Sequence, residues 1–304
     1  MSKSKISAVI CTWNEEKNLP GCLDSLGFAD EVVIVDTEST DGTKKIAKEN
    51  ADKFFEHKNL GIVEPVRNFA FGKASGEWIL VIDADERIPL SLVRELKNIV
   101  DEDKADYVRI PRSNKIFGHV MKYSRWWPDY NIRFFKKDFV TWQDAIHSIP
   151  ITNGRGMDLP AEEKMSITHL HYQDVNQYLE HLNRYTTKQA EELISKGYSF
   201  SHFDVIEKPI SEFISRFFAG QGYRDGFHGL ALSLLQSFSE LIVYLKIWER
   251  QKFIEERDIA SKPWREIYLK KSKEIFYWIY TLQMHLTTNK VKRFLLRIKR
   301  KYFL

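Results

Sequence analysis

Residues 78–86, Trp-Ile-Leu-Val-Ile-Asp-Ala-Asp-Glu, decide the fold class of this chain. Ile79 to Ile82 form an uninterrupted β-prone run, which is typical of a strand buried on both faces of a parallel sheet. Asp83 and Asp85 follow at its carboxyl end, where open α/β sheets place their ligands. Carboxylate oxygens suit Mg²⁺ or Mn²⁺, which often complete their shell with phosphate oxygens. The stretch indicates a cation and diphosphate site, although an isolated Asp-x-Asp triplet more often caps a turn.

The N-terminal part repeats the order strand, polar turn, helix. We expect strands over residues 6–11 and 31–35, and helices over residues 14–26 and 44–49. This order is the βαβ pattern of a nucleotide-binding domain. Because the chain has neither Gly-x-Gly-x-x-Gly nor a Walker sequence, a Rossmann dinucleotide site and a P-loop are disfavoured.

Three motifs have the order and spacing found in family 2 glycosyltransferases, which the chain resembles from about residue 6 to residue 250. They are Val-Ile-Cys-Thr-Trp-Asn-Glu-Glu at 9–16, the turn at 35–43 and Asp-Ala-Asp-Glu at 83–86. Residues 127–135 and 223–227 look like the branch that contains lipopolysaccharide core glucosyltransferases. The resemblance implies a GT-A fold, with a mixed central sheet flanked by helices. It also implies a nucleotide-sugar donor, expected to be a UDP-sugar, with Mn²⁺ or Mg²⁺ and inversion at the anomeric carbon.

The resemblance assigns roles to individual donor-site residues. Asp36 is expected to accept the imide hydrogen of uracil, although it could instead cap a helix. Asp83 is expected near the ribose, and Asp85 on a metal that bridges the pyrophosphate. Further donor-binding candidates border the nucleotide or its phosphates: Thr12, Asn14, Glu15, Arg67 and Arg133. Glu38 departs from the family, which usually has a small residue or glycine at that point.

The general base is left open by the sequence. An inverting transfer needs a carboxylate, or occasionally a histidine, to take the proton of the acceptor hydroxyl. We rank Asp144 first, Asp129 second and His147 third, and each could instead be a hydrogen-bonded loop residue. The related branch tends to have a His-Glu pair here, whereas Ser148 follows His147 in this chain.

Aromatic and imidazole side chains supply candidates for the acceptor and the metal. Trp126 and Trp127 could stack on sugar rings, or they could belong to the core. His169 and His171 lie on one face if their segment is extended. By analogy with GT-A enzymes that recruit a late histidine to the metal, we choose His171 over His169.

Composition divides the chain into two parts. We expect a catalytic domain over residues 1–198, with a donor half to about 105 and an acceptor half over 106–198, and a helical, basic extension over 199–304. A helix is expected over 174–196 and a loop over 154–163. The chain has two cysteines, Cys11 and Cys22, and no signal peptide is expected, so a cytoplasmic protein without a disulfide framework is predicted.

Positive charge is concentrated in the extension. Residues 201–304 contain nineteen lysines and arginines against eleven acidic residues, and residues 290–301 contain seven basic residues and no acidic one. Apolar residues interleave with these charges at helical spacing, which suits an anionic membrane surface. We expect peripheral attachment to the inner face of the cell membrane. The apolar segment 227–248 could instead pack on the catalytic domain or form a homo-oligomer, and it is not a convincing transmembrane span.

Two other classes of protein fit part of the pattern. A metal-dependent nucleotidyltransferase would share the sheet and the carboxylates, but it would usually have a glycine-rich, basic phosphate loop after the first strand. A non-catalytic module that binds a membrane or nucleic acid through the basic tail is the second alternative. No nucleic-acid recognition motif is present. The resemblance to family 2 glycosyltransferases implies an enzyme that transfers a hexose to a hydroxyl of a lipid-linked or lipopolysaccharide-type glycan.

Overall fold

The computed structural model describes residues 5–61, 63–142, 150–255 and 263–302. The chain forms two compact units, the first made of residues 1–115 and 127–171, and the second of residues 116–126 and 172–304. The sequence places a boundary near residue 198, whereas the structure divides the chain after residue 171. The physical reason is that the helix that follows packs on a later helix of the second unit.

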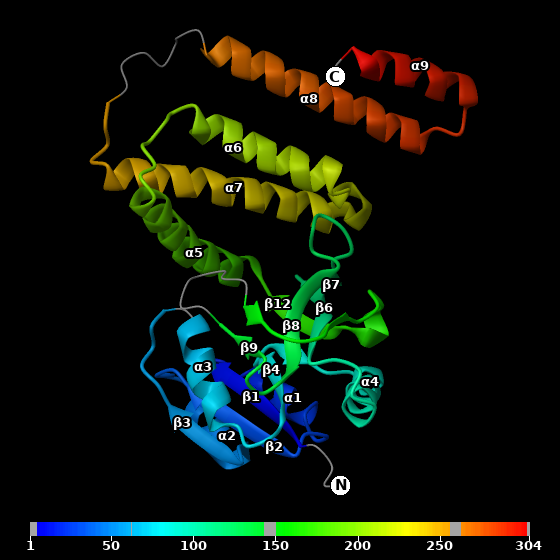
Figure 1. The fold of residues 1–304 in the computed structure, drawn as a ribbon. Helices are drawn as coiled ribbons and strands as arrows, with labels where there is room; N and C mark the ends of the chain where they lie inside the picture. Colours follow the sequence, from blue (N-terminus) through cyan, green and yellow to red (C-terminus); the bar gives the residue numbers. More distant parts are fainter. Residues whose placement is uncertain (1–4, 62, 143–149, 256–262, 303–304) are drawn as a thin grey trace. The chain divides into compact units, whose positions relative to one another are not determined.

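The first unit begins with parallel strands in the order β3, β2, β1, β4 (Figure 1). These strands are β1 (Ile6–Thr12), β2 (Glu31–Asp36), β3 (Lys53–Glu56) and β4 (Trp78–Asp83). The helices are α1 (Leu19–Asp24), α2 (Thr43–Asn50), α3 (Glu64–Lys73) and α4 (Leu90–Asp101). The predicted βαβ order is confirmed. Helix α1 begins later than residue 14, because Asn14 has a φ of 54°, which an α-helix does not accommodate.

Neighbouring residues of β1 and β4 enter different hydrophobic cores. Ile10 and Leu80 pack with residues of α1 and α4, whereas Val9 and Val81 pack with residues of α3. Both faces of these strands are therefore buried, which explains why they read as continuous apolar runs.

The sheet becomes mixed beyond β4. Strand β8 (Asp129–Lys136) runs antiparallel to both β4 and β6 (Tyr107–Ile116), and β12 (Ile167–Tyr172) runs antiparallel to β5 (Glu86–Arg87). Strands β9 (Val140–Thr141) and β10 (Ile151–Thr152) pair separately. The loop predicted over residues 154–163 is wrong in part: β11 (Gly156–Asp158) pairs with β6, and the 3₁₀ helix η1 begins at Glu163 and ends at Met165.

The register of the parallel strands places Thr12, Asp36 and Asp83 at neighbouring strand ends. Thr12 pairs with Asp36 across β1 and β2, and Cys11 pairs with Asp83 across β1 and β4. The carboxyl ends of β2, β1 and β4 consequently meet at one edge of the sheet, where an α/β protein binds its ligand.

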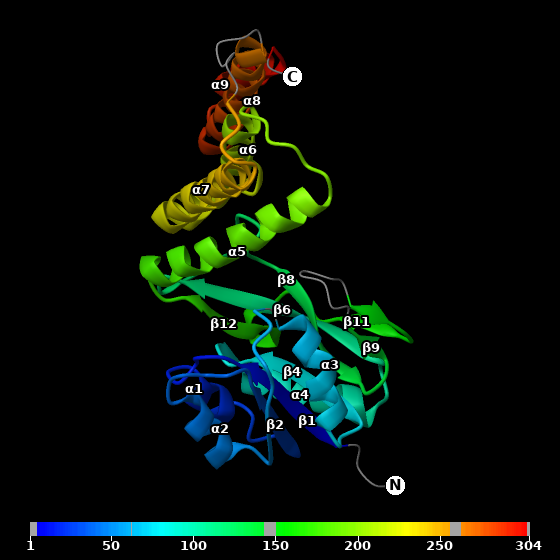
Figure 2. The ribbon, with the colours of Figure 1, turned by 90° about the vertical axis from the view of Figure 1, so that its left-hand side faces the viewer.

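The second unit consists mainly of helices (Figure 2). They are α5 (Val175–Ser195), α6 (Asp204–Phe213), α7 (Gly226–Arg250), α8 (Pro263–Leu286) and α9 (Lys290–Lys301), with short strand β7 (His119–Val120), π-helix η2 (Ile214–Ala219) and 3₁₀ helix η3 (Gly222–Asp225). Asp174 caps α5 by accepting a hydrogen bond from the Gln177 amide at 2.8 Å. The helix predicted over 174–196 is therefore confirmed.

The segment before Trp127 is fixed to the η3 turn within this second unit. The Asp225 carboxylate accepts hydrogen bonds from the backbone amides of Lys122 and Tyr123, at 3.1 and 2.9 Å. Only glycine fits at position 229, because a Cβ there would lie 1.8 Å from the carbonyl oxygen of Gly222. Close backbone packing thus sets the geometry of the η3–α7 junction.

Helix α7, with the η3 turn before it, is long and apolar enough to cross a membrane by length and composition. That criterion is also met by core helices of soluble proteins, and α7 does have a packed face that includes Leu232, Val243 and Ile247. Its other face leaves Phe227 and Leu234 exposed. The helix is therefore amphipathic in its packing, with one face free of the unit's core.

Candidate functional site

The edge formed by β1 and β2 contains two buried polar atoms that lack a partner. Asp36 is fully buried, and its Oδ2 accepts a hydrogen bond from the Ser39 amide at 3.0 Å. Within the described residues, the other oxygen, Oδ1, and the Thr12 hydroxyl form no hydrogen bond. Buried polar atoms are nearly always paired, so this pair indicates a position for a hydrogen-bonding ligand.

The turn after β2 is locked to the end of β1. The Asn14 amide donates to the Ser39 hydroxyl at 2.9 Å, and the Asn14 side-chain oxygen accepts from the Thr40 amide at 2.8 Å. Glu38 adopts a left-handed backbone with a φ of 60°, a conformation usually taken by glycine, and its carboxylate accepts from the Asn59 amide at 3.0 Å. The glutamate therefore keeps the backbone conformation that the family's glycine would favour.

Asp83 is neutralised by arginines at the end of β4. Its Oδ2 lies 2.6 Å from Arg133 Nη2, and its Oδ1 lies 3.2 Å from Arg67 Nη2. Burial by itself would raise the pKa of the Asp83 carboxyl, but the charges of Arg133 and Arg67 outweigh it and hold that pKa far below its usual range. Asp83 is therefore a firmly ionised carboxylate whose two oxygens are already engaged.

Glu86 lies beneath Asp83 and is fully buried. One of its oxygens accepts from the backbone amide of Asp83 at 2.9 Å, and the other lies 2.7 Å from Arg133 Nη2 and 3.3 Å from Arg112 Nη1. Strands β4, β5, β6 and β8 are thus joined by one charged network.

Asp129, the second candidate for the general base, is part of the same network. Its Oδ2 accepts hydrogen bonds from the Arg112 guanidinium at 2.7 and 2.9 Å and from the side-chain nitrogen of Asn114 at 3.2 Å. Burial would raise the pKa of the Asp129 carboxyl, but Arg112 outweighs this effect and lowers it. A carboxylate with a lowered pKa and a bound guanidinium is a weak proton acceptor, so this environment suits a positioning role.

Asn114 links this network to His169 by hydrogen bonds to both Asp129 and His169. Because the Asn114 side-chain nitrogen donates to Asp129, its oxygen is left to accept from His169 Nδ1, at 2.6 Å. The other ring nitrogen of His169, Nε2, lies 3.3 Å from Asp85 Oδ2. An imidazole nitrogen and a carboxylate oxygen this close together are both possible ligands of a divalent cation.

The residues at this point fit a divalent cation only together with further ligands. Two adjacent ligands of an octahedral ion lie about 3 Å apart for bonds of about 2.1 Å, which is close to the Asp85–His169 separation. His171 Nδ1 lies 3.2 Å from His169 Nε2. No group of three or more such side chains with metal-binding geometry occurs in the described ranges, so oxygens from a ligand would be needed to complete a shell.

The structure brings the donor-site candidates of the first unit together and leaves others elsewhere. Thr12, Asp36, Asp83, Asp85, Arg67 and Arg133 lie at or beside the strand ends. In the structure, His169 Nε2 lies 3.3 Å from Asp85 Oδ2, and His171 Nδ1 lies 3.2 Å from His169 Nε2. Asp144 and His147 lie outside the described residues.

The two candidate acceptor tryptophans fall in different units. Trp127 is half-buried in the first unit. Trp126 belongs to the second, where it packs on the core of α5 and α7 and its ring lies 5.3 Å from the Arg216 guanidinium carbon. Their role at an acceptor site remains a prediction.

Sequence reasoning missed Glu86, Arg112 and Asn114 as parts of the site, and it ranked His169 below His171. Glu86 directly follows Asp85, so its position in the motif was a usable signal. Arg112 and Asn114 alternate on β6, which gives them the same side of the strand, but nothing local indicates that this side faces carboxylates.

The carboxyl of Glu15, near this edge, has a raised pKa because of burial and nearby negative charges. Burial raises the pKa of its carboxyl, a hydrogen bond from Asn18 opposes the rise, and the neighbouring charges of Asp85, Asp83 and Asp41 add to it, giving a pKa of about 7. Near neutral pH, Glu15 is therefore divided between its protonated and ionised forms.

Replacing Glu15 with glutamine should stabilise the protein at pH 8 more than at pH 5.5. A carboxyl whose pKa is raised on folding favours the folded state below its unfolded pKa of 4.5, and this contribution is lost as the pH rises through about 7. We expect a gain of about 2 kcal/mol at pH 8, less than the full shift implies because the side chain is partly exposed. Denaturant unfolding at both pH values measures it, with Glu16→Gln as the control; an equal effect at both would contradict the shift.

Comparisons with known proteins identify one family model and several relatives that are named as glycosyltransferases. The family model described as glycosyl transferase family 2 matches residues 7–154. An uncharacterised glycosyltransferase of Rickettsia typhi is 29% identical over 255 residues, which cover 81% of this chain and 87% of that protein. LpsC of Rhizobium meliloti, a lipopolysaccharide core biosynthesis glycosyltransferase, is 25% identical over 82% of this chain and 93% of its own. A crystal structure of S. aureus TarS 1–349 in complex with UDP-GlcNAc is 17% identical, with a TM-score of 0.46. The alignment covers 82% of this chain and 92% of the TarS chain.

These relatives set aside the nucleotidyltransferase and the non-catalytic module. The observed mixed sheet flanked by helices, with helices following it, is the GT-A fold class that the sequence predicts. The matched domain contains the strand ends on which Thr12, Asp36, Asp83 and Asp85 lie. Residues 7–154 form a family 2 glycosyltransferase domain, and relatives named as glycosyltransferases align with about four-fifths of the chain.

Proposed function

We propose that this enzyme transfers a hexose from a UDP-sugar to a hydroxyl of a lipopolysaccharide-type or lipid-linked glycan, with inversion at the anomeric carbon. The observation that carries the proposal is the unpaired Oδ1 of Asp36, which is buried at the same sheet edge as Asp85. The acceptor class is supported by the similarity to LpsC over most of both chains.

The base of the donor is proposed to bind at Asp36. Uracil presents an imide N–H, which a carboxylate oxygen can accept, whereas cytosine presents a ring acceptor at the same position. The Thr12 hydroxyl, which also lacks a partner, can donate or accept beside it. Because the Ser39 amide holds the other Asp36 oxygen, the free oxygen has a fixed direction.

Asp85 and His169 are proposed to hold Mn²⁺ or Mg²⁺, with the donor diphosphate supplying further oxygens. When bound, the cation would neutralise charge on the departing diphosphate. The chain's own contribution is orientation: Asn114 accepts a hydrogen bond from His169 Nδ1 and so leaves Nε2 facing Asp85, while Arg133 and Arg67 occupy the two oxygens of Asp83. Choosing His169 in place of His171 follows from its distance to Asp85.

The acceptor side is proposed on sequence grounds. Asp144 remains our first choice for the general base, because the Arg112 guanidinium on Asp129 makes that carboxylate a weak proton acceptor. Trp127 is proposed to stack on a sugar of the acceptor.

Replacing Asp36 with asparagine should remove the preference for uracil. Calorimetry with Mn²⁺ is expected to show UDP binding weakened at least about tenfold, the value of one lost hydrogen bond to a charged group, with CDP binding changed much less. A neutral amide can present either a donor or an acceptor, so the discrimination should fall. Asp52→Asn is the matched control, because Asp52 caps the opposite end of β2 through the Val32 amide.

The control should keep the wild-type ratio of UDP to CDP affinity. An unchanged ratio in Asp36→Asn would contradict base recognition by this residue. Failure of the wild type to bind any UDP-, GDP-, CMP- or dTDP-sugar would reject the donor-binding proposal itself.

We further propose that α9 attaches the enzyme to the inner, anionic face of the cell membrane, which makes it a peripheral cytoplasmic protein. Helix α9 contacts α8 through buried Leu296 and through Arg300, whose guanidinium carbon lies 5.2 Å from the Tyr277 ring. The apolar residues at helical spacing on its other side are exposed: Val291, Phe294, Leu295 and Ile298. An exposed apolar stripe between rows of basic residues is the pattern of an interfacial helix.

Replacing Phe294 and Leu295 with serine should weaken vesicle binding at least about tenfold, because two exposed apolar side chains lose their burial in the lipid boundary. Co-sedimentation with phosphatidylglycerol-containing vesicles measures the change. Leu90→Ser, at a leucine of the first unit that is even more exposed, is the control. If the double variant binds vesicles normally but changes its sedimentation velocity from oligomer to monomer, the stripe is a subunit interface and the membrane proposal fails.

A further inference from the structure

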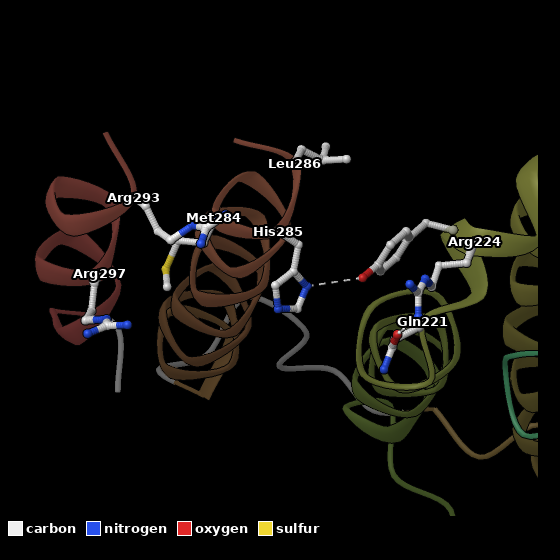
Figure 3. A pocket seen from close by; sticks show the side chains of 8 residues that line it. Gln221, Arg224, Met284, His285, Leu286, Arg293 and Arg297 are labelled. Carbon is white, nitrogen blue, oxygen red and sulfur yellow. Dashed lines mark hydrogen bonds between the residues drawn. The ribbon is translucent and has the colours of Figure 1, made fainter. Parts of the chain in front are cut away.

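A concave site occurs within the second, helical unit. It is a pocket of about 650 Å³ where the η3 turn, the end of α8 and α9 meet (Figure 3). Its lining includes Arg224 from η3, His285 from α8, and Arg293 with Arg297 from α9. These elements all belong to the second unit, so the pocket is a property of that unit alone.

The lining is strongly positive. It contains three arginines and no carboxylate, the other members being Gln221, Tyr223, Met284 and Leu286. In the part of the chain that the structure describes, none of the three guanidinium groups forms an ion pair. Arg224 donates to the Gln221 side chain at 3.0 Å, and Arg293 donates to the Thr287 carbonyl at 2.7 Å. Both arginines therefore keep further N–H groups for an anion.

Local contacts hold these side chains in place. Arg293 and Arg297 are four residues apart on α9 and so lie on one side of that helix. Figure 3 shows them on one side of His285 and Arg224 on the other, with the His285 ring 3.5 Å from the Tyr223 hydroxyl. The Arg224 guanidinium carbon lies 5.0 Å from the centre of the Tyr123 ring, and this cation–π contact helps to orient the Arg224 side chain.

We propose that this pocket binds the phosphate group of an anionic membrane lipid. Guanidinium groups match phosphate oxygens in geometry and charge, and a tyrosine hydroxyl and an imidazole add hydrogen-bonding groups. The lipid is favoured over a soluble phosphate because the same helix that supplies Arg293 and Arg297 exposes the apolar stripe of α9, defined above. A lipid with its phosphate in the pocket and its chains beside the stripe would satisfy both surfaces.

This inference deepens the membrane attachment proposed above and does not depend on which sugar is transferred. It differs from attachment by α9 alone because it requires a residue outside α9. Arg224 is far from α9 in sequence, so it should matter for lipid binding only if the pocket acts as a unit. Non-specific attraction to α9 would instead depend on the number of its charges.

The test compares variants of the full chain on phosphatidylcholine vesicles with and without phosphatidylglycerol, at constant ionic strength. Arg224→Gln and the double variant Arg293→Gln/Arg297→Gln remove pocket groups. Lys292→Gln/Lys299→Gln removes the same charge from the same helix, at residues that do not line the pocket. Thermal unfolding of each variant checks that the second unit remains folded, and Arg224→Lys tests the guanidinium separately from its charge.

We expect Arg224→Gln and the arginine double variant each to weaken binding to the anionic vesicles about tenfold, with a smaller loss for the lysine double variant. Arg224→Lys should fall between the wild type and Arg224→Gln. Equal losses in the two double variants, with none in Arg224→Gln, would overturn the pocket and leave only charge attraction.

Inorganic phosphate provides the second arm of the experiment. If phosphate binds to the wild type and is lost in Arg224→Gln while vesicle binding stays unchanged, the pocket takes a soluble anion and the lipid assignment is overturned. UDP binding measured on the same variants should be unchanged, because none of these residues is at the sheet edge. A loss of vesicle binding with intact UDP binding separates this inference from the proposed donor site.

Discussion

The site depends on one buried ion pair, between Arg133 on β8 and Glu86 on β5. Glu86 is fully buried and Arg133 is 3% exposed, so neither charge is stabilised by water. A buried charge left without its partner costs about 3 to 5 kcal/mol, which makes each residue dependent on the other. Arg133 also binds Asp83, and Glu86 also binds Arg112 and the Asp83 amide. The pair therefore ties the end of β4 to β8, where Arg133 lies fifty residues after Asp83 in the sequence.

This constraint gives two aspartates in one short motif different surroundings. Asp83 has both oxygens occupied by arginines, whereas Asp85 faces His169, whose tautomer is fixed by Asn114. The network also takes up Asp129 through Arg112 and lowers its pKa. Charge at the edge is thereby divided: arginines bind Asp83, Glu86 and Asp129, while Asp36 Oδ1 has no hydrogen-bond partner among the described residues and Asp85 lies beside His169. The pKa of Glu15 is raised mainly by burial, and the negative charges of Asp85, Asp83 and Asp41 add to the rise.

The sequence predicted those features that depend on local pattern. Apolar runs located β1, β2 and β4, and the polar residues that end them located the site edge, because strand ends and turns follow local residue types. It did not predict the contacts of Asp129 or the place of His169 beside Asp85, because these depend on pairing between β6, β8 and β12. The division after residue 171 was missed because α5 has an apolar face whose partner, α7, lies some fifty residues later. The first-ranked base, Asp144, lies outside the described residues.

The central claim is that the arginines reserve Asp85, and not Asp83, for the cation. Calorimetry of UDP binding with and without Mn²⁺, on Asp83→Asn and Asp85→Asn that are both shown to be folded, tests it most directly. The account predicts that Asp85→Asn abolishes the gain in UDP affinity caused by Mn²⁺, while Asp83→Asn retains that gain in a less stable protein. A retained Mn²⁺ gain in Asp85→Asn, together with its loss in Asp83→Asn, would contradict the account.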